Sequence, residues 1–289
     1  MMRVVPSPFM TSPVPRVMAI HDLAGFGRAA LTVVIPILSR MGVQVCPLPS
    51  AVYSTHGAFE GHTSLDLSEF MSSCLQHWTS LGIVFDAVYS GFLSNVEQIN
   101  CLTAYLEHHT NSRQLVLIDP VLGDHGKLYG VTDPRMVVAM RTYIAMADVI
   151  TPNLTEAALL LGASYNADID AETLHAWCVR LADMGPDTVI MTSVPAAHTS
   201  SELAVLVYRH TGGQFWLQSH EKLPAAFPGT GDTFSSVLLG CLLQGESLPV
   251  AISQAMQFVA DAIHVTLEHN TPVQEGILLE RVLDMLPCR

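Results

Sequence analysis

Residues 115–130, LVLIDPVLGDHGKLYG, carry the pattern on which the fold prediction rests. The first four residues are all apolar and lack the polar alternation of a strand with one exposed face, which is typical of a parallel strand buried on both faces. Asp119 follows at the carboxyl end of this strand, and Pro120 disfavours a helical continuation. Three glycines and three polar residues come next, so the segment is either a lid over a site or an ordinary surface connection.

Short apolar runs of the same kind alternate with helical patterns along the chain. This alternation predicts an α/β fold, with a doubly wound and mostly parallel central sheet covered by helices on both faces. We expect strands at Val17–His21, Val43–Leu48, Ala87–Ser90, Leu115–Asp119, Val149–Thr151, Thr188–Thr192, Leu203–Tyr208 and Phe215–Ser219. We expect helices at 29–41, 66–81, 95–109, 134–147, 154–161, 171–184, 232–244, 248–268 and 275–285. The turn-rich connection His210–Gly213 makes the last two strands an antiparallel hairpin at the sheet edge.

Composition limits the class of protein. The chain is 49% apolar and 13% charged, as in a globular domain. We expect a loose, proline-containing tail at 1–15 and one domain at 16–289. Thirteen basic and 26 acidic residues give a net charge of −13, which disfavours nucleic acid as a partner. No CxxC pair and no apolar run of about 18 residues occur, so we expect no zinc, no disulfide, no membrane partner and a cytoplasmic location.

Polar and glycine residues follow nearly every predicted strand. In doubly wound sheets, ligands bind beyond the carboxyl ends of the strands, so these residues predict one composite site. The positions are His21-Asp22, Ser54-Thr55-His56, Ser90-Gly91, Asp119-Pro120, Thr151-Pro152-Asn153, Thr192-Ser193 and Gly229-Thr230-Gly231-Asp232.

The run Gly229-Thr230-Gly231-Asp232 precedes an apolar, helical stretch. Backbone N–H groups and the helix dipole at such a start favour a bound anion. A carboxylate beside that anion can accept a proton from an attacking hydroxyl group. Taken alone, the run is also compatible with a loop that ends in an Asp cap.

Asn153 and Glu156 lie three residues apart at the start of another predicted helix, so they share a face. A carboxylate there can bind Mg²⁺, although Glu in a first helical turn is also common for dipole reasons. Gly25-Phe26-Gly27 permits close approach of a ligand. Ala30 breaks a GxGxxG motif and no GxxxxGK[ST] run occurs, which disfavours a dinucleotide-dependent dehydrogenase and a Walker-type phosphate loop.

Five strings, in this order, resemble the ribokinase superfamily, and within it the pyridoxal/pyridoxamine kinase branch. They are VYSTHGAFEG (52–61), SGFLSNVEQ (90–98), DPVLGDHGKLYG (119–130), ITPNLTEAALL (150–160) and PGTGDTFSSVLLG (228–240). The resemblance extends from about residue 16 to about residue 270, which is nearly the whole chain.

This resemblance implies that the enzyme uses ATP and Mg²⁺ to phosphorylate a hydroxymethyl group on a pyridine or pyrimidine ring. Asp232 takes the place of the family's catalytic base, and the anion hole corresponds to Gly229, Thr230 and Gly231. The carboxylates that hold Mg²⁺ and its waters correspond to Asp119 and Glu156. The residues near the ATP phosphates correspond to Asn153, Thr192, Ser193, His125 and Lys127. On the substrate side, our candidates are His21, Asp22, His56 and Phe92.

Departures from the family pattern concern the substrate pocket more than the phosphate machinery. The family's opening segment usually contains a serine, whereas this chain has IHDLAGFGRAA, and Pro228 stands where His is common. Three hypotheses follow: a kinase of pyridoxal, pyridoxamine and pyridoxine in vitamin salvage; a hydroxymethylpyrimidine kinase of thiamine synthesis; or an inactive pyridoxal-binding protein. The resemblance and the edge hairpin also imply a homodimer. A requirement for a monovalent cation stays open.

Overall fold

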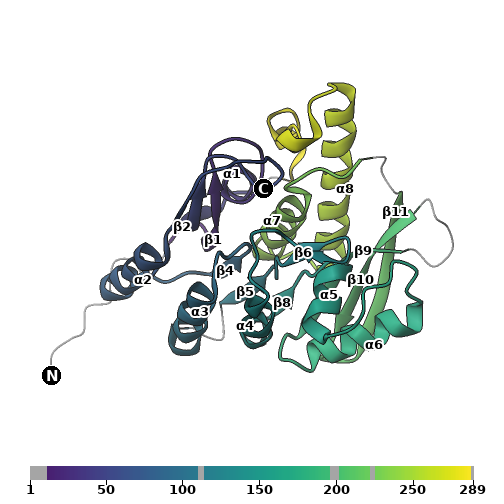
Figure 1. Cartoon of the computed structure of the whole chain (residues 1–289), viewed down its shortest axis with the longest axis horizontal. Coiled ribbons are helices and arrows are strands. Elements are labelled where there is room, and N and C mark those ends of the chain that lie inside the picture. The colour runs from purple at the N-terminus through teal and green to yellow at the C-terminus, as the bar shows by residue number, and fades with distance from the viewer. Residues whose placement is uncertain (1–11, 110–113, 196–201, 222–224, 288–289) are drawn as a thin grey trace.

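The computed structural model describes residues 12–109, 114–195, 202–221 and 225–287 (Figure 1). Within them, a sheet of nine strands has the order β11-β10-β9-β8-β5-β4-β1-β2-β3. The six strands from β2 to β9 along this order pair in parallel, whereas β3, β10 and β11 pair antiparallel at the two edges. The predicted mostly parallel sheet with an antiparallel edge hairpin is therefore confirmed.

The strands of this sheet are β1 Arg16–Ala24, β2 Gln44–Tyr53, β3 Ser64–Asp66, β4 Ala87–Ser90, β5 Leu115–Ile118, β8 Val149–Ile150, β9 Thr188–Pro195, β10 Glu202–Arg209 and β11 Gln214–Glu221. A separate hairpin consists of β6 Gly123–Asp124 and β7 Lys127–Leu128. The helices are α1 Leu31–Arg40, α2 Ser68–Leu81, α3 Val96–His109, α4 Arg135–Tyr143, α5 Leu154–Leu161, α6 Ala171–Ala182, α7 Thr230–Leu243 and α8 Leu248–Glu268.

Helices cover both faces of the sheet because its central strands send apolar side chains to both. In β1, Val17 and Ala19 join a core cluster with residues of α1, α7 and α8. Met18 and Ile20, which alternate with them, join a second cluster with residues of α2 to α6. Figure 1 shows the two groups of helices on opposite sides of the strands. This is the two-sided burial that the continuous apolar runs predict.

The predicted helix at 275–285 is wrong. Three short 3₁₀ turns stand there instead, at Val273–Glu275, Leu279–Arg281 and Leu283–Met285. Gly276 interrupts the helical pattern because its φ is 79°, and a Cβ at this position would lie 2.6 Å from the carbonyl oxygen of Arg28. The backbone is therefore held in a conformation and at a distance that suit only glycine.

Some expectations concern residues that are not described. Residues 1–11 of the predicted tail lie outside the described residues, as does Cys288, and the domain boundaries at 15 and 16 stay a prediction. Helix α8 is long and apolar enough to span a membrane by length and composition. Its buried residues Ala251, Ile252, Ala255 and Phe258 nevertheless belong to the core cluster beneath the sheet, which is the behaviour of a core helix.

Candidate active site

The start of α7 forms one wall of the candidate site. Gly229, the residue before the helix, has a φ of 80°, and a Cβ there would lie 2.3 Å from the carbonyl oxygen of Arg28. Only glycine allows the two loops to approach so closely. No side chain caps the helix. The N–H groups of its first turn are therefore available to an anion, as the sequence predicts for Gly229, Thr230 and Gly231.

Asp232 lies in the first turn of α7, and two elements hold its carboxylate. The backbone N–H of Ala30 donates a hydrogen bond of 2.8 Å to Asp232 Oδ2, while Oδ1 lies 3.6 Å from Nδ1 of His21. The Asp232 side chain is 16% exposed, so one part of it can meet a ligand. Ala30 has a φ of 53°, which is rare for a residue with a Cβ and is typical of strain stored at functional sites.

His21 is fully buried below Asp232. Its ring packs edge-on against Tyr89 with centroids 4.4 Å apart. A Cβ at position 91 would lie 2.3 Å from His21 Nδ1, so Gly91 leaves the space that the imidazole fills. The structure thus brings together two of the predicted residues, His21 and Asp232, and explains the glycine that follows β4.

Four buried or half-buried carboxylates gather at this edge of the sheet. Burial and then the negative charge of Asp232 raise the pKa of Asp22 to about 7. Burial and then the charge of Asp232 raise the pKa of Asp119 to about 8. Burial and then the charge of Asp119 raise the pKa of Glu156 well above its usual range. Because these groups raise one another's pKa, the site favours a bound cation.

Asp119 connects the carboxylates to α7. Its Oδ2 lies 3.4 Å from Ser235 Oγ, and a Cβ at Gly231 would lie 3.9 Å from the same oxygen. Ser235 Oγ in turn lies 3.1 Å from Thr151 Oγ1. The carboxylate that follows β5 and the glycine loop that precedes α7 are therefore neighbours, as the prediction of one composite site requires.

Glu156 completes a capping box at the start of α5. Asn153 Oδ1 accepts from the N–H of Glu156 at 2.9 Å, and Glu156 Oε2 accepts from the N–H of Asn153 at 2.8 Å. Glu156 Oε1 accepts from the N–H of Leu122 at 3.2 Å. Both carboxylate oxygens thus hold backbone groups, so the helix-start role that the sequence left open for Glu156 is present.

These residues also fit Mg²⁺. The described residues contain no group of three or more His, Cys, Asp or Glu side chains that forms a metal site by itself. Mg²⁺ commonly keeps several waters and binds through one or two carboxylates together with the phosphates of a nucleotide. Asp119, beside the glycine loop, suits such direct or water-mediated contact, and Glu156 suits a contact through water.

The segment after Asp119 is a short hairpin. His125 and Gly126 form its two-residue turn with φ values of 50° and 76°, as tight hairpin turns require. His125 and Lys127 are exposed, and their contact with the ATP phosphates stays a prediction. Gly123 serves close packing, because a Cβ there would lie 2.1 Å from the Lys127 carbonyl oxygen.

Thr192 and Ser193 lie beside α5. The N–H of Thr192 donates to the Pro152 carbonyl oxygen at 2.9 Å, and Thr192 forms a β-bridge with Asn153. Ser193 is exposed and has a φ of 55°. The register between β9 and β10 shifts at this point, an irregularity of the kind that re-aims side chains at a strand end. Three predicted nucleotide-contacting residues, Asn153, Thr192 and Ser193, therefore share one edge.

The remaining candidates lie on the side of β2. His56 is buried, its Nε2 lies 2.7 Å from the Gln274 carbonyl oxygen, and burial lowers its pKa. A Cβ at Gly27 would lie 2.4 Å from the His56 ring, which explains that glycine. Phe92 is half-buried, and its ring lies 6.2 Å from that of Tyr53. These side chains form an aromatic flank next to Asp22.

Sequence reasoning missed four contributors. Tyr89 packs on His21. Burial raises the pKa of the Tyr53 phenol, a hydrogen bond with Ser94 lowers it, and the charge of the nearby Asp22 raises it. Burial and then the charge of Glu156 raise the pKa of Tyr129. Tyr129 belongs to the DHGKLYG string, so that motif was an available signal. Ala30 contributes only its backbone N–H, and no side-chain pattern points to such a role.

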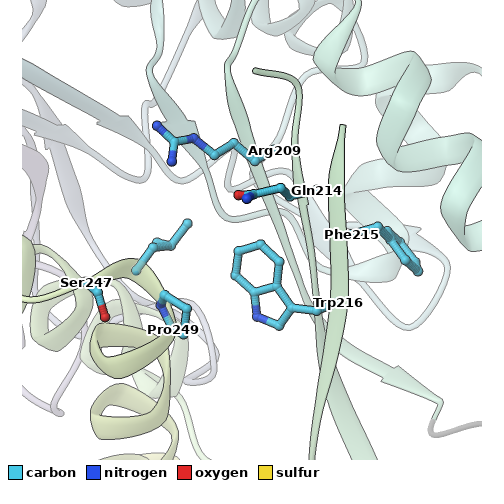
Figure 2. Close-up of a pocket in the computed structure, with 7 residues that line it drawn as sticks. Arg209, Gln214, Phe215, Trp216, Ser247 and Pro249 are labelled. Carbon is cyan, nitrogen blue, oxygen red and sulfur yellow. The ribbon is translucent and has the colours of Figure 1, made fainter. Parts of the chain in front are cut away.

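A hollow of about 560 Å³ lies elsewhere, between the β10–β11 hairpin and the start of α8. Figure 2 shows Arg209, Gln214 and Trp216 facing Ser247 and Pro249 across it, while Phe215 points away. Arg209 pairs with Thr188, the first residue of β9. The hollow is therefore at the amino end of the parallel strands, opposite the carboxyl end where the carboxylates gather.

Comparison with known proteins identifies the family. The family model described as phosphomethylpyrimidine kinase matches residues 56–277. The chain belongs to this family. A crystal structure from Bacteroides thetaiotaomicron VPI-5482, of a protein described as a phosphomethylpyrimidine kinase and solved with pyridoxal, is 46% identical with a TM-score of 0.91 and covers 94% of this chain and 96% of its own.

Two further family relatives are described as acting on pyridoxal-type compounds. Pyridoxal kinase from Lactobacillus plantarum is 32% identical with a TM-score of 0.86, over 95% of this chain and 97% of its own. A pyridoxine/pyridoxal/pyridoxamine kinase from Bordetella bronchiseptica is 28% identical over 274 residues, or 91% of this chain and 94% of the relative. The predicted kinase fold and the pyridoxal kinase branch are confirmed.

Proposed function

We propose that this family member transfers the γ-phosphoryl group of ATP to the hydroxymethyl group of pyridoxal, pyridoxamine or pyridoxine, in a Mg²⁺-dependent reaction. The observation that carries the proposal is the arrangement around Asp232. Its carboxylate is fixed by the N–H of Ala30 and lies in the first turn of an uncapped helix, so a proton acceptor and an anion site adjoin. The 46% identical relative solved with pyridoxal supports the choice of substrate.

The chain's own groups can perform each step of the transfer. Asp232 accepts the proton of the substrate hydroxyl group. The hydroxyl oxygen forms a bond to the γ-phosphorus of ATP, and the bond from that phosphorus to the oxygen that leaves with ADP breaks. The N–H groups at the start of α7 stabilise the charge on the transferring group. Asp119 would hold Mg²⁺ directly or through water, and the ion would supply neutralisation of phosphate charge. Asn153, Thr192 and Ser193 lie at the edge where the nucleotide phosphates would extend.

A hydroxymethylpyrimidine kinase is the second candidate, because the matching family model and the Bacteroides protein both carry that description. The two alcohols present the same reacting group on different rings. Purified protein with ATP and Mg²⁺ should be assayed on the three pyridoxal-type alcohols and on hydroxymethylpyrimidine in parallel. Higher kcat/KM for the pyrimidine would replace the first proposal by the second, and binding without turnover would favour the inactive pyridoxal-binding protein.

We also propose that the chain forms a homodimer and acts in the cytoplasm. Support for the dimer comes from β11, an edge strand on which Phe215 and Leu217 are 38% and 39% exposed. An uncovered edge with apolar side chains favours pairing with another chain. A monomeric mass by light scattering at micromolar concentration would rule out a stable dimer.

A further inference from the structure

Asp22 is a buried carboxylate whose charge the phosphoryl transfer does not use. It is 7% exposed and lies near the end of β1. The pairing of β1 with β4 ends at Ile20 and Ser90, so the chain from His21 onward extends past its neighbour over the edge where the site lies. The register of β1 against β2 also shifts between His21 and Leu23. Such irregularities commonly redirect a side chain beside an active site.

The charged and titratable groups around Asp22 do not neutralise it. From α7, the nearby charge is that of Asp232, a second anion. From β2, the nearby group is the phenol of Tyr53, and from β1 itself it is His21, whose Nδ1 faces Asp232. Arg28, the next cation along the chain, is engaged by Glu280 at 2.9 Å. A backbone hydrogen bond lowers the pKa of Asp22 but only partly offsets its burial, so the carboxylate gains from a positive or hydrogen-donating group that arrives with a ligand.

The chemistry of the three alcohols suggests what that partner is. They differ at the ring position next to the reacting hydroxymethyl group, which carries an aldehyde, an aminomethyl or a second hydroxymethyl group. With the reacting oxygen at Asp232, the neighbouring substituent lies on the same edge of the ring. An ionised carboxylate only accepts hydrogen bonds, so it attracts an ammonium group and repels an aldehyde oxygen. An alkylammonium group keeps its charge up to about pH 10.

We infer that Asp22 is a specificity-determining residue that binds the aminomethyl cation of pyridoxamine, so that this kinase favours pyridoxamine over pyridoxal. The inference rests on the proposed function, because it needs a pyridoxal-type alcohol at Asp232. Tyr53 and Phe92 then flank the ring beside Asp22, and His21 supports Asp232 from below.

The preference should depend on pH. Asp22 has a pKa of about 7, so its carboxyl group loses its proton as the pH rises through neutrality. Below that pH, its O–H can donate a hydrogen bond to the aldehyde oxygen of pyridoxal. The ratio of kcat/KM for pyridoxamine to that for pyridoxal should therefore rise about 10-fold between about pH 6 and about pH 8.5, the value of one charge-assisted hydrogen bond at its lower limit.

The test is the same ratio in variants. Asp22→Asn should lower kcat/KM for pyridoxamine about 10- to 100-fold at about pH 8.5 and should flatten the pH dependence of the ratio. Asp22→Ser is the second variant if the first folds poorly. Asp66→Asn is the matched control. The charge of Asp66 also raises the pKa of the Tyr53 phenol, but the Asp66 side chain is exposed and already accepts hydrogen bonds from Asn95 and Gln98.

The outcomes distinguish a failure of the role of Asp22 from a failure of the proposed kinase activity. If the wild-type enzyme phosphorylates none of the three alcohols, the proposed function fails first. If it phosphorylates them and neither Asp22 variant changes the ratio, the role of Asp22 is refuted while the function stands. An equal change in the Asp66→Asn variant would also refute a specific contact.

Discussion

Replacing Asp22 by asparagine should stabilise the folded protein at alkaline pH. The pKa of Asp22 rises from 3.8 to about 7 on folding, because burial and then the charge of Asp232 disfavour its ionised form. A folded protein that holds a proton more tightly than the unfolded chain loses stability as the pH rises. The wild-type protein therefore loses stability from about pH 4 to about pH 7, and this contribution is fully lost above pH 7.

The size of the effect follows from that change in pKa. It corresponds to about 4 kcal/mol in the free energy of unfolding once Asp22 is ionised. For a chain of this length, about 2 °C in Tm accompanies each kcal/mol, so Asp22→Asn should raise Tm by about 8 °C at about pH 8.5. At about pH 4 the two proteins should differ little, since the carboxyl group is then neutral in both states.

Thermal unfolding measured across this pH range, without ligand, is the assay. Asp66→Asn is again the control, because it makes the same chemical change at an exposed side chain. A Tm difference between wild type and Asp22→Asn that is constant with pH, or that shrinks at alkaline pH, would refute the argument. In that case Asp22 would have a cationic partner that the described residues do not supply.

Three further changes test the machinery around Asp232. Asp232→Asn should reduce kcat about 10²- to 10⁴-fold, the usual contribution of a general base, while ATP still raises Tm; near-normal turnover would exclude Asp232 as the base. Magnesium and ATP should raise Tm more at about pH 8.5 than at about pH 6, since Asp119, with a pKa of about 8, must lose its proton to hold the cation, and an equal gain at both values would contradict this. Gly91→Ala should lower the free energy of unfolding by at least about 2 kcal/mol and should remove much of kcat, because a Cβ 2.3 Å from His21 Nδ1 displaces that ring. Unfolding followed by circular dichroism and initial rates measure the two effects, and wild-type values for both would contradict the prediction.

The positions after the strands could be predicted from sequence because parallel strands deliver their carboxyl ends to one edge. Asp119 and Asn153 lie at that edge for this reason, and Asp232 joins them because β11, the strand before it, runs in the same direction as β9 although it pairs antiparallel with β10. The pairing of His21 with Asp232 also depends on Gly91, whose missing side chain leaves room for the imidazole. A single sequence shows that glycine but does not show which side chain fills its place.

Other features could not be predicted because they depend on backbone geometry. Ala30 holds Asp232 through its N–H, and its positive φ leaves no mark in the pattern of residue types. The apolar spacing at 275–285 suits a helix, yet Gly276 is fixed by its approach to the Arg28 carbonyl, which comes from a distant part of the chain. His125 and Lys127 are exposed because the hairpin that carries them is only two residues long on each side.

The attachment of the β6–β7 hairpin to α5 limits how the site can open. Glu156 holds the N–H of Leu122, Asn153 Nδ2 donates to the Gly123 carbonyl at 2.9 Å, and Thr155 Oγ1 accepts from the N–H of Gly126 at 2.9 Å. Breaking three such bonds costs about 3 kcal/mol, so a fully detached hairpin is populated in fewer than about one molecule in 100. The base of the hairpin therefore stays attached to α5 in most molecules, and we expect adjustments to a ligand at this wall to be confined to the exposed side chains of Lys127 and His125.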